Sequence, residues 1–212
     1  MSETNGRALA VPAERHLPEF GAPPADPVPL LRGWFEDAIQ LGVAEPGALA
    51  LATTDADGSI SNRIVKVLGI TARGLVFTSH ADSQKGRDLA VNAWASGVFY
   101  WRELGQQMII TGPVERLSNT ESDALWEARP AGTHAMSVAS HQSSRLDDEQ
   151  ALRTEARRLN AAGERLPRPA RWLGYLLIPA AVEFWHIGTE RLHLRLRYDL
   201  ANGAWAVRRL QP

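Results

Sequence analysis

The chain has 212 residues, 23 of them basic and 24 acidic, so its formal net charge is −1. This balance argues against a general binder of nucleic acids or anionic membranes, whose basic excess usually shows in the total. The absence of cysteine excludes disulfides, thiolate metal sites and cysteine nucleophiles. No apolar run approaches the ~18 residues that span a bilayer, and the N-terminus has no apolar signal core. We expect a cytoplasmic protein with a flexible arm over residues 1–25 and one domain over residues 26–212.

The first predicted element is an amphipathic helix over residues 26–42. Asp26 is a favourable N-cap, Pro27 suits the first helical position, and the apolar stripe ends at Gly42. The apolar pattern then changes to that of strands, which are predicted over residues 48–54, 59–70, 75–79, 97–104, 106–117, 174–187, 191–200 and 204–210. Further helices are predicted over residues 83–92, 119–129 and 147–163, the last closed by Gly163.

Tight turns such as "DADG" at residues 55–58 join most of the consecutive strands. The predicted class is therefore mainly β with α (α+β), an antiparallel barrel with helices packed outside it rather than a βαβ array. Glycine signatures for dinucleotides or phosphates, G-x-S-x-G and H-E-x-x-H are missing, and the six histidines have no ligand spacing. We expect neither a metal site nor a serine nucleophile.

One candidate anion site is the start of the predicted helix at "SQKGR". Ser83, Lys85 and Arg87 lie there, where free N–H groups and the helix dipole favour a phosphate. The alternative is an ordinary N-cap with a solvated lysine.

A second candidate is "RLHLRLR" at residues 191–197. Leucine alternates there with Arg191, His193, Arg195 and Arg197, so an extended strand would carry one apolar and one cationic face. The cations need an anionic ligand, or carboxylates of neighbouring strands if this is simply an exposed strand.

Seven short segments follow one another in a characteristic order: "RIV" (63–65), "SQKGR" (83–87), "QQM" (106–108), "RP" (129–130), "QSS" (142–144), "EFW" (183–185) and "RLH-x-R" (191–195). This order resembles the FMN-binding split-barrel flavoproteins of the pyridoxamine 5′-phosphate oxidase family. The likeness runs from about residue 26 to the C-terminus. Segments such as "HADSQKGR" and "VRRLQP" are similar to the branch of that family that acts in phenazine biosynthesis.

The resemblance implies a split antiparallel β-barrel that forms a homodimer, with FMN bound non-covalently at the interface. Cofactor contacts are implied for Arg63, Ile64, Val65, Lys66, Thr78, Ser79, Gln84, Lys85, Gln107, Gln142, Ser143, Trp185 and Arg195. Substrate contacts are implied for Leu68, Leu125, Arg129, Thr133, Arg191, Leu192 and His193. Arg191, His193 and Arg195 are the implied catalytic residues.

Several positions depart from the vitamin B6 enzyme of the family. This chain has Leu68 for a lysine, Leu125 for a tyrosine, Thr133 for a serine and Gln84 for an arginine. Losing a cation and a hydroxyl from a phosphate-binding cup removes charge-assisted bonds of roughly 1.5–3 kcal/mol each. A flat aromatic carboxylate should fit better than a phosphate ester.

The resemblance therefore implies an FMN-dependent oxidase of phenazine biosynthesis. It would oxidise a reduced (dihydro or tetrahydro) phenazine carboxylic acid by hydride transfer to FMN, with O2 reoxidising the flavin to yield H2O2. One alternative is a pyridoxamine or pyridoxine 5′-phosphate oxidase. Another is a split-barrel protein that binds a flavin without catalysis. A barrel that binds nucleic acid is disfavoured by the net charge.

Overall fold

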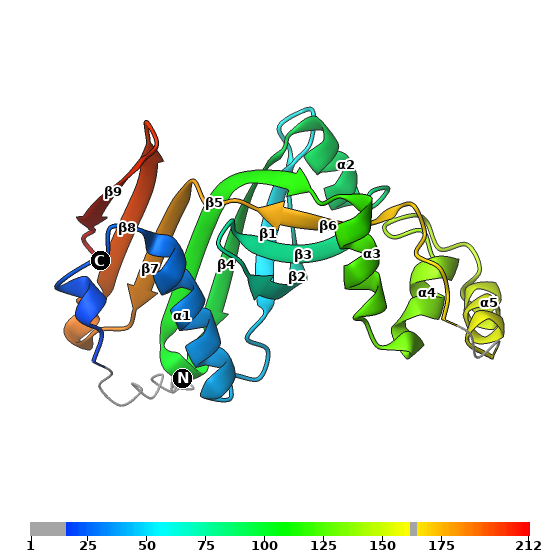
Figure 1. The fold of residues 1–212 in the computed structure, drawn as a ribbon, viewed down its shortest axis with the longest axis horizontal. Helices are drawn as coiled ribbons and strands as arrows, with labels where there is room; N and C mark the ends of the chain where they lie inside the picture. The colour runs from blue at the N-terminus through cyan, green and yellow to red at the C-terminus, as the bar shows by residue number, and fades with distance from the viewer. Residues whose placement is uncertain (1–15, 162–164) are drawn as a thin grey trace, which may run out of the picture.

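The computed structural model describes residues 16–161 and 165–212, and in this part nine strands form one antiparallel sheet (Figure 1). The sheet order is β4-β1-β2-β3-β6-β5-β7-β8-β9, and an additional β4–β5 pairing closes β1 to β6 into a barrel. The strands are β1 Ala48–Thr54, β2 Ile60–Ile70, β3 Leu75–His80, β4 Trp94–Trp101, β5 Gln106–Arg116, β6 Trp172–Leu177, β7 Ala181–His186, β8 Leu194–Ala201 and β9 Ala204–Arg209. The predicted antiparallel barrel with flanking helices is confirmed.

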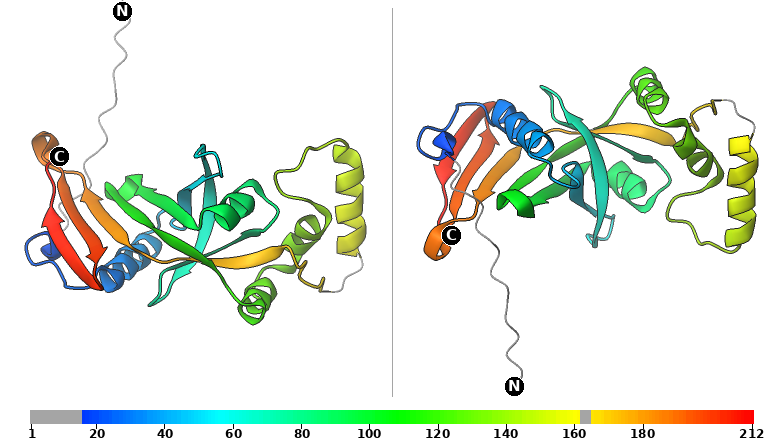
Figure 2. Two further views of the ribbon diagram at one scale, coloured as in Figure 1. Left: turned by 90° about the horizontal axis from the view of Figure 1, so that it is seen from above. Right: turned by 90° about the horizontal axis from the view of Figure 1, so that it is seen from below.

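The helices are α1 Pro27–Gln40, α2 Gln84–Val91, α3 Asn119–Glu127, α4 His134–Ala139 and α5 Glu149–Ala161, with 3-10 turns η1 Pro18–Phe20, η2 Arg102–Leu104, η3 Ala131–Thr133 and η4 Thr189–Arg191. Seen from above and below, β8 and β9 lie at one end of the molecule and α5 at the other, with the barrel between them (Figure 2). The sequence did not predict α4, which has six residues and no side-chain cap. The predicted closure of α5 at Gly163 lies outside the described residues.

The core follows from the alternation of side chains along the strands. Every second residue of β1 is buried, and Leu49 and Leu51 are completely so. Helix α1 begins where the Asp26 carboxylate accepts a hydrogen bond from the Val28 amide at 2.9 Å, and it buries Trp34 among the core residues.

Strand β5 belongs to both halves of the sheet. Its first six residues pair with β7, whereas residues 114–116 pair with β6. Between them, a Cβ on Gly112 would lie 2.0 Å from the Ile178 carbonyl oxygen, so only glycine permits this crossing. The predicted single strand over 174–187 was therefore wrong. It breaks at residues 178–180 because Pro179 has no N–H to donate to a ladder.

The predicted flexible arm differs from the structure over its described part. Phe20 is buried, the Trp34 indole N–H donates to the Glu19 carboxylate at 2.7 Å, and the Tyr198 hydroxyl donates to the Pro24 carbonyl at 3.0 Å. This segment is thus attached to α1 and β8 through Glu19, Phe20 and Pro24, although residues 21–25 are exposed; the proline content of the arm obscured its aromatic anchor, Phe20. Residues 1–15 lie outside the described part.

The cationic strand begins later than its alternating sequence predicted. Glu190 and Arg191 have left-handed backbones, with φ of 52° and 63°, and strand β8 starts only at Leu194. The Leu192 amide donates to the Thr189 carbonyl at 2.9 Å, which closes a turn. Arg191 and His193 are therefore turn residues, and only Arg195 and Arg197 lie on the cationic face of the strand.

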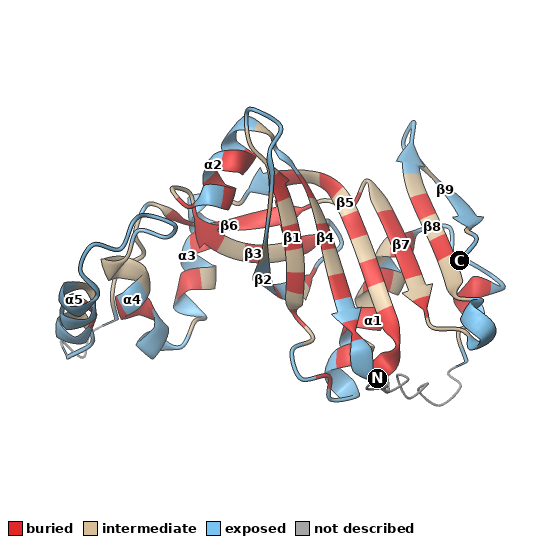
Figure 3. Ribbon diagram, turned by 180° about the vertical axis from the view of Figure 1, so that it is seen from behind, coloured by how far each residue is buried: buried red, intermediate tan, exposed pale blue. Residues whose placement is uncertain are grey.

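One face of the larger half of the sheet has no helix over it. Viewed from behind, β1, β4, β5, β7 and β8 present this face openly (Figure 3). Its residues are those that alternate with the core, such as Gln107 and Ile109 on either side of the buried Met108.

Candidate active site

A buried lysine forms the centre of the first polar cluster. The Ser83 hydroxyl caps α2 by accepting from the Gly86 amide at 3.2 Å, and Lys85 turns inward, leaving 6% of it exposed. Its ammonium donates to the Ser79 hydroxyl and to the Gln142 side-chain oxygen, both at 3.1 Å. These partners are neutral, and none of the described carboxylates forms an ion pair with this ammonium. The alternative of an ordinary N-cap with a solvated lysine is therefore confirmed for the Ser83 cap but wrong for Lys85.

The charged form of Lys85 is destabilised by its surroundings. Burial and, secondarily, the positive charge of Arg63 lower the pKa of Lys85 to about 8, while the negative charge of Asp88 has a smaller, opposite effect. A cation kept dry beside another cation is an arrangement that favours an anionic ligand. A phosphate would supply the missing negative charge.

Arg63 is fixed by a buried carboxylate on the same helix as Lys85. Its guanidinium donates to the hydroxyls of Thr53 (2.6 Å) and Ser61 (2.5 Å). Both hydroxyls in turn donate to the Asp88 carboxylate, at 2.6 and 3.0 Å, and that carboxylate lies 3.7 Å from Arg63. Asp88 thus orients Arg63 through two hydroxyl groups.

The loop that carries Gln142 and Ser143 is tied to the start of α2. The His141 ring lies 3.0 Å from the Asp82 carboxylate, and Arg171 donates to the Ser140 carbonyl at 3.0 Å. Ser143 is exposed and has a left-handed backbone, with φ of 71°. Gln142 therefore reaches Lys85 from an anchored loop.

A second cluster lies on the uncovered face of the sheet. Gln107, Trp185 and Arg195 are direct register partners across β5, β7 and β8. The His193 ring packs beside Trp185, with ring centroids 4.8 Å apart. The two rings are inclined by 44°, and together they form an aromatic surface flanked by the Gln107 amide and the Arg195 guanidinium.

The cations of β8 face carboxylates within the chain. Arg195 donates through Nε to the Glu183 carboxylate at 2.8 Å, and Arg197 donates to Asp199 at 2.9 and 3.0 Å. The Arg208 guanidinium lies 2.7 Å from Asp199 as well. The interpretation of this segment as a strand paired with acidic neighbours is thus confirmed for residues 195 and 197.

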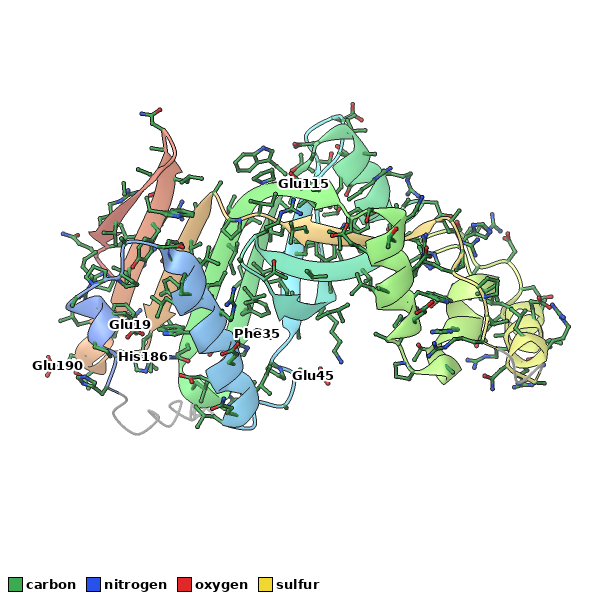
Figure 4. All side chains as sticks on the ribbon, in the orientation of Figure 1. Glu19, Phe35, Glu45, Glu115, His186 and Glu190 are labelled. Carbon is green, nitrogen blue, oxygen red and sulfur yellow. The ribbon has the colours of Figure 1, made fainter. Side chains whose placement is uncertain are left out.

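The residues implied for the substrate do not share one cavity in a single chain. Arg129 lies between the Trp126 and Trp172 rings, 5.1 Å from each centroid, and burial lowers the pKa of its guanidinium. Thr133 is exposed in η3, and Leu68 is 45% exposed on β2. Arg191, Leu192 and His193 directly follow Glu190, which Figure 4 shows at the end of the molecule opposite the α4 of Figure 1.

Leu125 lines a separate apolar cavity of about 480 Å³ together with Val76 and Leu176. Alternation along β3 places Val76 and Thr78 on the face opposite Ser79. Leu125 and Thr78 therefore do not face the Lys85 cluster.

Four further positions implied for the cofactor also differ from the others. The Val65 side chain is buried in the core, which leaves only its backbone for a ligand. Ile64 and Lys66 are exposed on the alternate face of β2. Gln84 is exposed and lines a different hollow, with Asp55 and Arg87.

Two carboxylates behind the arginines were missed from the sequence. Asp88 follows Lys85 by three residues on one helix, and Glu183 is a lone charge within an apolar strand. Each is about 5% exposed or less. For Asp88 the available signal was its place beside Leu89 on the buried face of α2, whereas for Glu183 it was only the single charge among apolar neighbours.

No group of three or more His, Asp or Glu residues able to hold a metal occurs in the described ranges 16–161 and 165–212. Among the helices of those ranges, none is both long and apolar enough to cross a membrane.

Comparison with known proteins places this geometry in a family. Residues 35–162 match the family described as "Pyridoxamine 5'-phosphate oxidase", and residues 172–212 match "Pyridoxine 5'-phosphate oxidase C-terminal dimerisation region". The chain is 48% identical over 196 residues to a dihydrophenazinedicarboxylate synthase of Burkholderia lata, and the matched region covers 92% of each chain. It is also 45% identical over 181 residues to a pyridoxine/pyridoxamine 5'-phosphate oxidase of Paraburkholderia phymatum, covering 84% of this chain and 85% of the other.

A solved structure agrees with these matches. PhzG from Burkholderia lata, crystallised with tetrahydrophenazine-1-carboxylic acid, superposes with a TM-score of 0.92 at 47% identity, covering 94% of this chain and 98% of that one. The split-barrel prediction is confirmed by this likeness. The chain belongs to the pyridoxamine 5′-phosphate oxidase family.

Proposed function

We propose that the chain is an FMN-dependent oxidase of phenazine biosynthesis that oxidises a reduced, dihydro or tetrahydro, phenazine carboxylic acid. The observation that carries the proposal is the buried Lys85 ammonium, which has neutral hydrogen-bond partners and a second cation, Arg63, nearby. The high identity to a dihydrophenazinedicarboxylate synthase supports the choice of substrate.

The residues fit FMN at both of its ends. Lys85, Ser79, Arg63 and Ser143 offer donors to a phosphate, and Gln107, Trp185 and Arg195 offer a flat surface and a cation to the flavin ring. Bound FMN would supply an acceptor for a hydride from the substrate, and its reoxidation would pass two electrons, together with two protons, to O2 to give H2O2.

The two clusters are proposed to meet across a homodimer. The match of residues 172–212 to a dimerisation region supports this assembly, as does the sheet face without a helix (Figure 3). The ring-binding cluster lies on that face, whereas the phosphate-binding cluster lies at α2. Each site would then take one cluster from each copy.

The chain's own groups would bind and orient the substrate. Arg195 is proposed to stabilise the negative charge of the reduced flavin ring, and Arg129, Arg191 and His193 to hold the carboxylate. We assign no acid–base residue, because a dihydro-aromatic ring gains aromaticity when it loses a hydride and a proton, and the proton can pass to solvent. Leu68 and Leu125 leave no cation or hydroxyl for a phosphate ester at those positions.

The principal alternative is a pyridoxamine or pyridoxine 5′-phosphate oxidase. Sequence identity does not distinguish the two functions, since the chain is 48% identical to a dihydrophenazinedicarboxylate synthase and 45% identical to a pyridoxine/pyridoxamine 5'-phosphate oxidase. The departures at Leu68 and Leu125 argue for the carboxylate. A flavin carrier without activity would have no use for Arg129, Arg191 and His193.

Anaerobic mixing tests the proposal. FMN-loaded protein should stay yellow with pyridoxamine 5′-phosphate and bleach with a reduced phenazine carboxylate. Bleaching by the phosphate ester would indicate a vitamin B6 oxidase. Failure to bind FMN at all would refute both the phenazine oxidase and the vitamin B6 oxidase.

A further inference from the structure

Glu183 is a buried carboxylate on a face of the sheet that is otherwise only half-buried. It is 4% exposed, and its register partners on either side are Ile109 of β5 and Arg197 of β8. A carboxylate taken out of water in this way is destabilising unless cations meet it. Two guanidiniums do so, those of Arg195 and Arg197.

The contacts with these two arginines are unequal. Arg195 places both Nε and Nη2 on one oxygen, Oε1, at 2.8 and 2.7 Å. The nearest approach of Arg197 is 3.8 Å, to the other oxygen, Oε2. Arg197 instead donates two bonds to Asp199. Glu183 is therefore mainly the counter-ion of Arg195.

Arg195 is held rigidly by this arrangement. Its third nitrogen, Nη1, donates to the Gln211 carbonyl at 3.0 Å, so all three nitrogens have partners inside the chain. The guanidinium cannot rotate without breaking a charge-assisted bond. Its orientation and its effective charge are both set by the carboxylate behind it.

We propose that Glu183 is a positioning residue that fixes Arg195 beside the flavin ring and partly neutralises it, and so limits how strongly the site prefers reduced over oxidised FMN. The proposal rests on the function proposed above, because it requires Arg195 to face the ring. Removing the negative charge should leave Arg195 a stronger cation and favour the more negative, reduced form of the cofactor.

The test compares binding of FMN and of dithionite-reduced FMN, each titrated anaerobically into apoprotein. Glu183→Gln keeps an oxygen for Arg195 to donate to but removes the charge. The ratio of the oxidised to the reduced dissociation constant should rise about tenfold. Asp199→Asn is the matched control, because it removes a carboxylate of the same strand network that does not contact Arg195. Its ratio should stay within about twofold of the unmodified protein.

A second background shows whether the effect passes through Arg195. Glu183→Gln should change the ratio less in the Arg195→Met background than in the unmodified protein, because the part of its effect that depends on the position of Arg195 is lost there. Arg195→Met leaves Glu183 with Arg197, 3.8 Å away, as its nearest counter-ion, whereas the double variant removes both charges of the pair and can be measured even where Glu183→Gln alone does not fold. Neither comparison uses substrate.

An unchanged ratio in Glu183→Gln, an equal change in Asp199→Asn, or an effect of Glu183→Gln that is equally large in the Arg195→Met background would overturn the proposal. If the unmodified protein binds neither form of FMN, the proposed function itself fails. That result is distinguishable from the other three.

Discussion

Replacing Lys85 by methionine should make the apoprotein more stable and the FMN complex weaker. The pKa of Lys85 falls from 10.5 to about 8 on folding. At about 1.4 kcal/mol per pKa unit, keeping this ammonium charged at pH 7 costs about 3 kcal/mol. Methionine removes that cost but loses the two hydrogen bonds to Ser79 and Gln142, together worth about 1–2 kcal/mol. The net gain is about 1–2 kcal/mol, or roughly 2–8 °C in Tm for a chain of this size.

The pH dependence gives the sign of this effect a separate check. The folded form releases its Lys85 proton at a lower pH than the unfolded chain, so the cost is complete below about pH 8. It disappears as the pH rises from about 8 to 10.5, where the unfolded lysine also loses its proton. The stability advantage of Lys85→Met should therefore be large at pH 7 and nearly absent at pH 10.5.

Thermal and urea unfolding of flavin-free protein measure the stability. Lys66→Met is the stability control, since Lys66, the only other lysine, is exposed. Fluorescence titration should show FMN binding about 10- to 100-fold weaker in Lys85→Met, as expected for the loss of a charge-assisted bond to phosphate. In the unmodified protein FMN affinity should fall as the pH rises above about 8. An apoprotein of Lys85→Met no more stable at pH 7, or a gain that persists at pH 10.5, would refute the reasoning.

Two further substitutions test the scaffold. Asp88→Asn turns the charged acceptor for the Thr53 and Ser61 hydroxyls into a neutral one. It should lower the free energy of unfolding, measured in urea, by about 1–3 kcal/mol, whereas the control Lys66→Met should not. A loss under about 0.5 kcal/mol would contradict the role of Asp88. Gly112→Ala should cost more than about 3 kcal/mol, because its Cβ would lie 2.0 Å from the Ile178 carbonyl oxygen, and near-normal melting would show that β5 crosses differently.

Local patterns predicted the elements better than their pairing. Alternating burial in β1 and the Asp26 cap of α1 follow from nearest-neighbour chemistry, so the sequence was sufficient for them. The break at Pro179 was readable in principle, since proline cannot donate to a ladder. The sharing of β5 by β6 and β7 was not, because it depends on contacts between residues about 70 positions apart.

The same distinction applies to the site. Lys85 was identified from a helix N-terminus, which is a local feature, but its burial depends on Gln142, 57 residues away. The alternating pattern wrongly predicted that Arg191 and His193 lie in a strand, because the same sequence of residue types can adopt an extended or a turn backbone. Only the left-handed φ angles at Glu190 and Arg191 separate the two.

The arginines and the lysine of the proposed site differ in how their charge is balanced. Arg63 has Asp88 behind it and Arg195 has Glu183, each a buried carboxylate. Lys85 has neutral partners. The arginines are therefore held in orientation at reduced charge, whereas Lys85 supplies the uncompensated charge on which anion affinity depends.

This division predicts how the two kinds of substitution combine. Lys85→Met should weaken oxidised and reduced FMN by the same factor, because the phosphate carries the same charge in both. Glu183→Gln should instead change the ratio of the oxidised to the reduced dissociation constant, which Lys85→Met leaves unchanged. The two residues have no shared contact, so in the double variant the effects on each dissociation constant should multiply to within about twofold. Titration of both FMN forms into the four proteins measures this. A larger departure would mean that the phosphate-binding and ring-binding clusters are energetically coupled, and that the charge at Lys85 also tunes the flavin.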